Sequence, residues 1–341
     1  MIIRSKAPLR IGLAGGGTDV SPYSDIYGGA ILNATISLFA YTSIKPRNDG
    51  KIVIYAIDRN ERIELNSEEE LPIDGNLDLA KGVYNRIVKD FVKQPLSFEI
   101  NTYVDAPPGS GLGSSSTLVV AILGAFVEWL KLPLGEYDIA HLAYSIERED
   151  LKMAGGKQDQ YAATFGGVNY MEFFANDKVI VNPLRIKTEF LNELEHNLVL
   201  FYTQTSRLSS KIIEEQSKNV HSKKASSIDA MHQLKIQSVL MKEAILKGDI
   251  DNIGKILHDG WMHKREMAEG ISNASIDTIY ENALAAGATG GKISGAGGGG
   301  FMIFYAPYIY KYPLINKLSE IGGTVMNYTL TNQGLTTWTM S

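Results

Sequence analysis

Along the first hundred residues, apolar positions alternate with polar ones or carry β-branched side chains, and this pattern predicts β-strands. Strands are expected over residues 2–3, 31–44, 52–57, 62–65 and 96–104. Between them, residues 79–91 place apolar side chains four positions apart, which predicts a helix. Residues 118–130 (LVVAILGAFVEWL) are apolar on nearly every face, so we expect a helix buried at the centre of the fold.

The rest of the chain mixes helical and strand patterns without a regular alternation. Helices are expected over 139–146, 158–164, 208–267, 276–286 and 309–321, and strands over 167–174, 178–181, 291–293, 301–305, 324–330 and 335–339. This order predicts an α+β fold and argues against a doubly wound parallel sheet. Because 341 residues exceed the size of a single core and Pro183 separates the two patterns, we expect two domains, residues 1–182 and 183–341.

Composition limits the partners that the chain can have. The net charge is −5 and no long Lys/Arg run occurs, so we expect neither a nucleic-acid nor a membrane partner. Cysteine is absent, which removes disulfides, thiolate nucleophiles and cysteine zinc sites. No stretch approaches the ~20 apolar residues of a membrane span, and the first residues lack the apolar core of a signal peptide. We therefore expect a cytoplasmic protein.

Three glycine-rich stretches are the main candidates for chemistry. They are LAGGGTD at residues 13–19, PPGSGLGSSSTL at 107–118 and SGAGGGG at 294–300. Glycine leaves backbone N–H groups unshielded and reaches positive φ at low cost, so such loops can wrap closely around an anion. A single stretch of this kind could be a tight turn, but three in one chain favour an anion-binding site.

The second stretch leads directly into the buried helix, which puts its serines at a helix N-terminus. The first-turn N–H groups there lack partners and the helix dipole favours negative charge. Capping accounts for one hydroxyl, whereas a phosphate site with a hydroxyl on Mg²⁺ accounts for the others. The chain has no P-loop motif. The dinucleotide-like pattern from Gly295 to Gly300 runs into a predicted strand instead of a helix, so we reject it.

Two acidic segments could contribute a carboxylate. Glu147 belongs to a charged run at the end of a predicted helix, a pattern typical of a solvated surface. Asp159 follows a Gly-Gly pair and begins a short segment of small residues. It could be an N-terminal helix charge or a carboxylate directed at a substrate hydroxyl, and spacing alone leaves both open.

The three glycine stretches together resemble the motifs of the GHMP kinase superfamily, which includes galactokinase, homoserine kinase and mevalonate kinase. Residues 7–19 are similar to the first motif, residues 107–116 to the second (P-x-x-x-G-L-x-S-S-[AS]) and residues 292–299 to the third, in the same order. Within the superfamily, the first motif is most similar to that of the D-glycero-D-manno-heptose 7-phosphate kinases. The resemblance implies an N-terminal ribosomal-protein-like α+β domain and a C-terminal ferredoxin-like domain with extra helices.

The resemblance also implies the roles of individual residues. The second motif would hold the ATP phosphates through Pro108, Gly109, Ser110, Gly111, Leu112, Gly113, Ser114, Ser115 and Ser116. Ser115 and Glu147 would hold Mg²⁺, with Glu149 as the alternative to Glu147. Asp159 would accept the proton of the attacking sugar hydroxyl or orient that hydroxyl, and Arg10 would stabilise the negative charge on Asp159 and on the transferring phosphoryl group.

The substrate-binding residues implied by the resemblance are Gly16, Gly17, Thr18, Asp19, Lys157, Gly297 and Gly298. Galactokinases carry Glu-His at the position of Gly16-Gly17, so the two glycines leave space for a sugar longer than a hexose. A phosphate on that sugar would need a cation, for which Lys157 is the first candidate and Arg148 and Lys152 are weaker ones.

The expected activity is phosphorylation of the anomeric hydroxyl of D-glycero-D-manno-heptose 7-phosphate. The product would be a 1,7-bisphosphate for GDP-heptose biosynthesis. Two alternatives stay open: a 1-kinase for an unphosphorylated sugar such as fucose or galactose, and a non-catalytic ligand sensor with the same fold.

Overall fold

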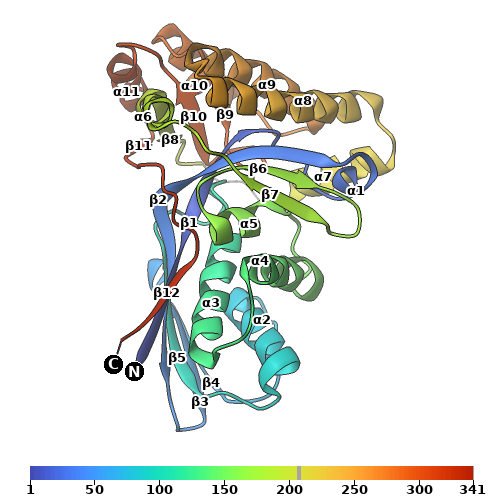
Figure 1. Ribbon diagram of the computed structural model, residues 1–341, viewed down its shortest axis with the longest axis vertical. Coiled ribbons are helices and arrows are strands. Elements are labelled where there is room, and N and C mark those ends of the chain that lie inside the picture. Colours follow the sequence, from blue (N-terminus) through green and yellow to red (C-terminus); the bar gives the residue numbers. More distant parts are fainter. Residues whose placement is uncertain (206–208, 341) are drawn as a thin grey trace.

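The structure is a computed structural model that describes residues 1–205 and 209–340, and it contains two β-sheets with helices packed against them (Figure 1). The larger sheet contains β1 (Ile2–Ala14), β2 (Gly29–Pro46), β3 (Lys51–Ala56), β4 (Glu61–Asn66), β5 (Phe98–Val104), β6 (Val168–Phe173), β7 (Val179–Pro183) and β12 (Thr336–Met340). Its strand order is β12-β1-β2-β5-β3-β4, with β6 and β7 added beside the first half of β2. All pairs are antiparallel except β3 with β5.

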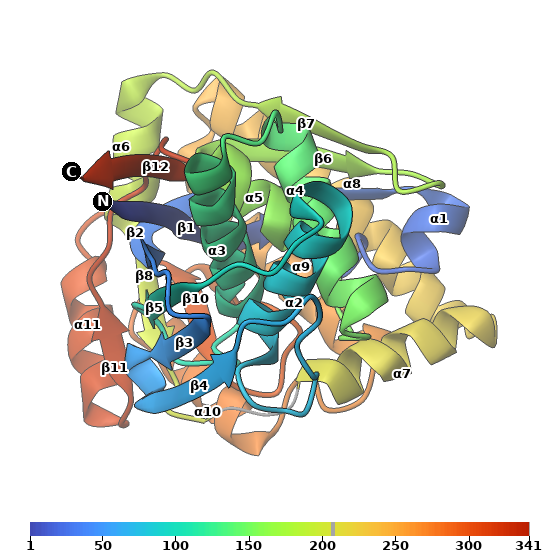
Figure 2. The same cartoon turned by 90° about the horizontal axis from the view of Figure 1, so that it is seen from below.

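One face of the larger sheet is covered by helices. They are α2 (Asp78–Ile87), α3 (Ser114–Leu130), α4 (Glu136–Ser145) and α5 (Gln158–Phe165), with π-helical turns at Val88–Val92 and Ile146–Asp150. A 3-10 turn at Ile57–Arg59 joins β3 to β4, and the short helix α1 (Tyr23–Tyr27) packs through Tyr23 against His232. Helix α3 lies against β1 and β2 at the centre of this layer (Figure 2). Its residues 119–126 are all buried, which confirms the predicted central helix.

The smaller sheet has the order β11-β8-β10-β9 and is antiparallel throughout. Its strands are β8 (Leu198–Tyr202), β9 (Gly290–Ile293), β10 (Phe301–Tyr305) and β11 (Thr324–Met326). The helices that accompany it are α6 (Thr188–Asn197), α7 (Ser209–His221), α8 (Ala225–Lys247), α9 (Ile253–Met267), α10 (Ala274–Ala285) and α11 (Lys311–Glu320), with a 3-10 turn at Ile250–Asn252. A strand order of 4-1-3-2 in a β-α-β-β-α-β sequence is the ferredoxin-like arrangement, in which α7 to α10 stand where the simple arrangement has one helix between the first two strands.

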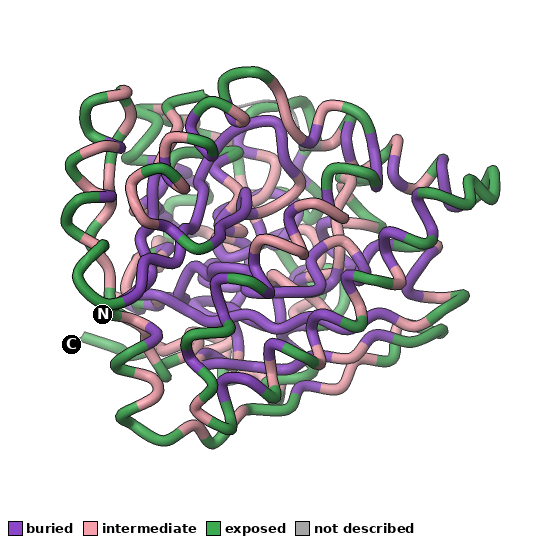
Figure 3. Tube along the Cα trace, turned by 90° about the horizontal axis from the view of Figure 1, so that it is seen from above, coloured by how far each residue is buried: buried purple, intermediate pink, exposed green. Residues whose placement is uncertain are grey.

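Alternation along β10 places apolar side chains on both faces of the smaller sheet. Phe301, Ile303 and Tyr305 pack into a core continuous with that of the larger sheet, whereas Met302 and Phe304 pack under α9, α10 and α11. The chain trace shows these buried strands at the centre and the exposed segments at the periphery (Figure 3). The two sheets therefore share one packed boundary, along which the glycine stretches lie.

The structure confirms most of the predicted elements and corrects several. The sequence pattern does not predict α6 or β8, because α6 buries only a few apolar side chains and β8 is a short run without alternation. The predicted helical segment 208–267 is three helices, and its first residue lies outside the described part of the chain. The predicted strand 324–330 is shorter, ending at Met326.

A segment near the C-terminus crosses back to the first domain. Strand β12, near the C-terminus, pairs with β1 of the larger sheet over Ile2–Lys6, so this part of residues 183–341 belongs structurally to the first domain. Pairing with β12 satisfies the backbone groups on the outer side of β1.

Within the described residues, none of the helices is long and apolar enough to cross a membrane.

Candidate active site

The second glycine stretch forms a loop that ends where α3 begins. Gly109, Gly111 and Gly113 have φ of 69°, 84° and 78°, a region that side chains with a Cβ rarely adopt. Helix α3 starts at Ser114, and no side chain caps it. Its first-turn N–H groups therefore point out of the helix without intrahelical partners, at the positive end of the helix dipole.

The serine hydroxyls of this loop are used for something other than capping. Ser115 Oγ donates to Glu147 Oε1 at 3.3 Å, and Ser116 Oγ accepts from Gln160 Nε2 at 3.1 Å. Ser110 Oγ is buried and has no partner among the described residues. Free N–H groups and hydroxyls gathered at a helix N-terminus form an anion-binding site.

The third glycine stretch supports the second one from the other domain. Gly111 and Gly295 pack so closely that a Cβ on either would collide with the backbone of the other stretch. Phe301 N–H donates to the Ser110 carbonyl at 2.8 Å, and Ser294 Oγ donates to the Gly111 carbonyl at 2.9 Å. This contact needs glycines on both sides, and it fixes the phosphate-site loop against the smaller sheet.

Not every residue of the third stretch faces the cleft. Gly295 and Ala296 line it. Gly297, which the sequence analysis expected at the substrate, packs against Ile271 instead. Gly298, also expected there, donates its N–H to the Ile271 carbonyl at 2.9 Å. Gly297 and Gly298 thus hold the loop between α9 and α10.

Asp159 and Arg10 meet directly beside the start of α3. Arg10 Nε and Nη2 both approach Asp159 Oδ1, at 2.7 and 2.6 Å. Arg10 Nη1 donates to the Gly111 carbonyl at 2.6 Å, which ties the guanidinium to the phosphate-site loop. Asp159 itself touches Gly113, because a Cβ built on that glycine would lie 3.0 Å from Asp159 Cγ. The structure therefore joins three residues that are far apart in sequence.

Glu147 is brought to the same place by an irregularity in its helix. It lies in the π-helical turn that continues α4, and its side chain is only 1% exposed. Glu147 Oε2 accepts a hydrogen bond from Gln160 Nε2. Glu149, the alternative, is 57% exposed and faces Arg86. The wider turn directs Glu147 inward to Ser115 and leaves Glu149 outside.

The first glycine stretch contributes Asp19 to the cleft but keeps Thr18 out of it. Asp19 Oδ2 accepts backbone N–H bonds from Lys157 at 2.9 Å and Gln158 at 3.0 Å, so it binds the N-terminus of α5. Burial raises the pKa of Asp19, and the nearby Asp159 carboxylate adds to this effect. The Thr18 hydroxyl donates to backbone carbonyls, among them that of Gly15 at 2.8 Å, inside its own turn.

The Lys157 ammonium is not directed into the cleft. It lies 3.0 Å from Asp25 Oδ1 and 2.9 Å from Asp177 Oδ1, and the side chain is 2% exposed. Its charge is compensated by these carboxylates on the opposite side of the α5 N-terminus. The weaker candidates Arg148 and Lys152 do line the cleft. Arg148 faces Glu147 at 3.7 Å, and Lys152 is exposed.

Two buried lysines that the sequence analysis missed lie beside the first glycine stretch. Lys264 of α9 lines the cleft and donates to the Gly295 carbonyl, and Lys292 of β9 donates to the Gly12 carbonyl at 3.0 Å. A Cβ on Gly16 would lie 3.7 Å from Lys264 Nζ and 3.8 Å from Lys292 Nζ. A possible signal for Lys264 was its position midway between buried Trp261 and Met267, on the apolar stripe of its helix.

Burial strongly affects the ionisation of both lysines. It lowers the pKa of Lys264 to about 8, and the nearby Arg10 charge contributes to the decrease. It lowers the pKa of Lys292 well below its usual range, with the charges of Lys264 and Arg10 acting in the same direction. Both amines are therefore costly to charge where they lie, and an anion bound beside them would favour their protonated forms.

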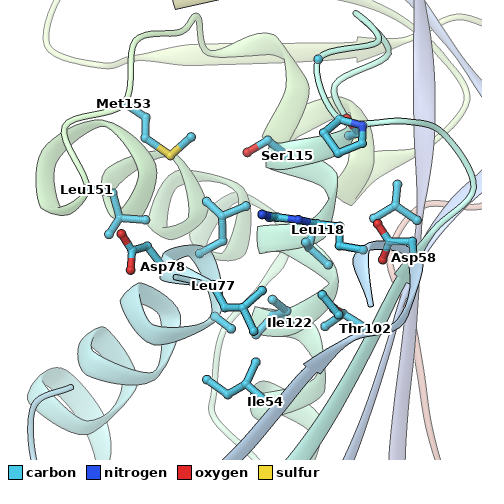
Figure 4. Close-up of a pocket in the computed structure, with 18 of the residues that line it drawn as sticks. Ile54, Asp58, Leu77, Asp78, Thr102, Ser115, Leu118, Ile122, Leu151 and Met153 are labelled. Atoms are coloured by element: carbon cyan, nitrogen blue, oxygen red, sulfur yellow. The ribbon is translucent and has the colours of Figure 1, made fainter. Parts of the chain in front are cut away.

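Two cavities meet at the phosphate-site loop. The first, of about 470 Å³, is the cleft between the domains, lined by residues of all three glycine stretches. The second, of about 500 Å³, is apolar, with Ile54 and Ile122 at the end away from Ser115 (Figure 4). Both are lined by Gly109, Ser114, Ser115 and Met153. An elongated ligand can therefore pass from the apolar cavity, over the N-terminus of α3, to Asp159.

Two family models match this chain. Residues 78–167 match the N-terminal domain of GHMP kinases, and residues 241–308 match the GHMP kinase C-terminal domain. These ranges include the second and third glycine stretches.

Three named proteins illustrate the similarity. The D-glycero-α-D-manno-heptose 7-phosphate kinase of Campylobacter jejuni is 50% identical over 336 residues, 98% of each chain. A crystal structure of a D-glycero-D-manno-heptose 1-phosphate kinase from Bacteroides thetaiotaomicron is 47% identical, covers 99% of each chain and has a TM-score of 0.86. The L-fucokinase/L-fucose-1-P guanylyltransferase of Bacteroides fragilis is 26% identical over 89% of this chain and 34% of that protein.

Proposed function

This chain belongs to the GHMP kinases, ATP-dependent phosphotransferases with a hydroxyl acceptor, and we propose that its acceptor is the anomeric hydroxyl of D-glycero-D-manno-heptose 7-phosphate. The observation that carries the proposal is the position of the Arg10–Asp159 pair. The pair lines the cleft beside the phosphate-site loop, and Lys264 lines the same cleft. Phosphoryl transfer requires the acceptor hydroxyl to lie next to the donor phosphate, with a group beside it that accepts or orients its proton, and Asp159 can be that group.

The apolar cavity supports binding of the nucleotide base. Leu77, Leu118 and Ile122 give it flat apolar walls, and Asp58, Asp78 and Thr102 supply polar groups that can orient a base (Figure 4). From there the phosphates would extend over the N-terminus of α3, where N–H groups and the hydroxyls of Ser114 to Ser116 are available. Because the cavity and the loop are contiguous, neighbouring residues are available to bind both the base and the phosphates of ATP.

The residues at Ser115 fit a Mg²⁺ ion that arrives with the nucleotide. A hydroxyl and a carboxylate, Ser115 and Glu147, lie together at the phosphate site, and both are the hard oxygen donors that Mg²⁺ prefers. Among the described residues, no three His, Cys, Asp or Glu side chains cluster as a metal site of their own. When bound, the ion would neutralise charge on the phosphates.

Asp159 is the base in this proposal. The acceptor oxygen forms a bond to the γ-phosphorus while the bond from that phosphorus to the β–γ bridging oxygen breaks. The proton of the acceptor hydroxyl passes to the Asp159 carboxylate, and ADP leaves. Arg10 holds Asp159 Oδ1 and would stabilise the charge that spreads over the phosphoryl oxygens in the transition state. Asp19 lines the same cleft and would bind a sugar hydroxyl.

The names of the relatives support a phosphorylated heptose as the acceptor. One relative is named a 7-phosphate kinase and the other a 1-phosphate kinase, and both are about half identical to this chain. The fucokinase, whose name includes an unphosphorylated sugar, is only 26% identical. Heptose 1-phosphate is thus the second candidate acceptor, and fucose is a weaker one.

A coupled ATP-consumption assay tests the proposal. The acceptors are heptose 7-phosphate, heptose 1-phosphate, the unphosphorylated heptose, fucose, galactose and mevalonate. We expect the highest kcat/KM with heptose 7-phosphate, and phosphorus NMR of the product should show a new phosphate on the anomeric oxygen. If the enzyme prefers heptose 1-phosphate, the phosphoryl group is transferred to a hydroxyl other than the anomeric one. If it prefers an unphosphorylated hexose, the heptose assignment is refuted.

A further inference from the structure

The acceptor half of the cleft can be separated from the nucleotide half by the residues that line it. Gly109, Ser114, Ser115 and Met153 line both cavities and mark the path of the nucleotide phosphates. Gly17, Asp19, Gln216, Lys264 and Met267 line only the cleft. Lys264 therefore lies in the part of the cleft that the apolar cavity does not share, where the acceptor must bind.

The Lys264 ammonium lacks the partner that a buried cation normally has. The residue is 3% exposed, and within the described part of the chain it forms no ion pair. Its hydrogen bond is to a neutral carbonyl, that of Gly295. Three other cations near the cleft are already engaged: Arg10 with Asp159, Lys157 with Asp25, and Arg148 with Glu147. Lys152 also lines the cleft, but it is exposed.

Lys292 adds a second buried ammonium behind the first. Gly16 provides no side chain, so the two ammonium groups border the same space beside its Cα, and Lys292 also bonds only a carbonyl. Burying two like charges together costs stability unless an anion binds nearby. Asp19, the nearest carboxylate on the first glycine stretch, directs one oxygen to the N–H groups of α5 and only partly offsets them.

We propose that Lys264 binds the phosphate group that the acceptor already carries, and that this anion in turn favours the charged form of Lys292 behind it. The proposal rests on the proposed function, because it assigns a residue to the phosphate of a phosphorylated heptose. The acceptor would lie with its reacting hydroxyl at Asp159 and its phosphate at Lys264, so Lys264 determines specificity for a phosphorylated over an unphosphorylated sugar.

The test compares Lys264→Met with wild type on heptose 7-phosphate and on the unphosphorylated heptose. Methionine keeps the apolar stem and removes the buried charge, so the variant should fold. Loss of a charge-assisted contact should raise KM for heptose 7-phosphate about tenfold or more. The kcat/KM for the unphosphorylated heptose and the Kd for ATP should stay within about twofold. Lys255→Met, an exposed lysine on the same helix, is the matched control and should change neither.

Three results would overturn the assignment. An equal loss with both acceptors would mean that Lys264 acts on the transferring phosphoryl group of ATP, and no change with either would mean that it is structural. Inorganic phosphate should compete with the acceptor at Lys264. If phosphate inhibits the Met variant as strongly as wild type, this also counts against the assignment. Should the Met variant not fold, Lys264→Arg is expected to keep the preference and Lys264→Gln to lose it. If wild type does not phosphorylate heptose 7-phosphate at all, the proposed function fails instead.

Discussion

Asp19 Oδ2 accepts the backbone N–H of Gln158 at 3.0 Å, so the first glycine stretch is bonded to the first turn of the helix that carries Asp159. Gly156 makes this possible, because a Cβ there would collide with the Asp19 carboxylate. The bond holds α5 at the orientation in which Asp159 faces Arg10 and Gly113. Asp19 thus has a positioning role besides its place in the cleft.

We predict that Asp19→Ala lowers both stability and turnover. The variant loses the acceptor of two helix N-terminal N–H groups, which costs roughly 1 kcal/mol of unfolding free energy, and α5 is no longer fixed against the first stretch. Asp19→Asn keeps an oxygen acceptor and should recover most of the thermal stability. The measurements are the Tm and kcat of both variants. Equal Tm values for Asp19→Ala and wild type would show that the bond does not hold the helix.

We predict that Asp159→Asn loses most of its turnover while it still binds ATP. The amide keeps the shape of the carboxylate and its contact with Gly113, but it cannot accept the proton of the acceptor hydroxyl. Removing a general base typically lowers kcat by about 10²–10⁴-fold. Steady-state kinetics and ATP binding by calorimetry test this. If kcat stays within a few-fold of wild type, deprotonation does not depend on Asp159.

We predict that Glu147→Gln raises the Mg²⁺ concentration needed for half-maximal rate. The carboxylate is buried beside Ser115, and an amide oxygen is a weaker ligand for a hard cation. Glu149→Gln is the matched control, since Glu149 is two residues away but exposed and faces Arg86. The measurement is a Mg²⁺ titration of the rate at saturating ATP. If the two variants give identical titration curves, Glu147 does not bind Mg²⁺.

The sequence predicted the parts of this site that depend on local pattern. A serine-rich turn followed by an apolar helix is enough to place Ser115 at a helix N-terminus. The order of three glycine stretches and the resemblance they carry were enough to nominate Arg10, Glu147 and Asp159, and the structure brings these residues together. Their spacing alone could not have shown that Arg10 reaches Asp159, 149 positions away.

The cations of the acceptor side depend on tertiary packing, which the sequence does not reveal. Lys157 is close to Asp159 along the chain, but the N-terminus of α5 turns its ammonium to Asp25 and Asp177. Lys264 lies in a charged run, HKRE, and looks like a surface residue until α9 is packed against the third glycine stretch. Only the packed structure shows which side of α5 and of α9 faces the cleft, and therefore that Lys264 and not Lys157 is directed into it.

The remaining prediction concerns pH and follows from the environment of Lys264. The groups that face it are Arg10 of β1, Lys292 of β9 and Asp19 of the first stretch. Burial lowers the pKa of Lys264 to about 8, so the side chain is about nine-tenths charged at pH 7 and about one-tenth charged at pH 9. A sugar phosphate, with a second pKa of about 6, keeps its charge over this range.

KM for heptose 7-phosphate should therefore rise up to about tenfold between pH 7 and pH 9, because deprotonation removes the cation that binds the phosphate. The free energy of unfolding should rise over the same range, although binding of the phosphate weakens. The unfolded chain holds the Lys264 proton up to a higher pH than the folded chain, so this residue destabilises the fold less as pH rises through 8. Lys264→Met should abolish the rise in KM while the pH dependence of KM for ATP stays the same. A rise that persists in the Met variant would place the titrating group elsewhere in the cleft.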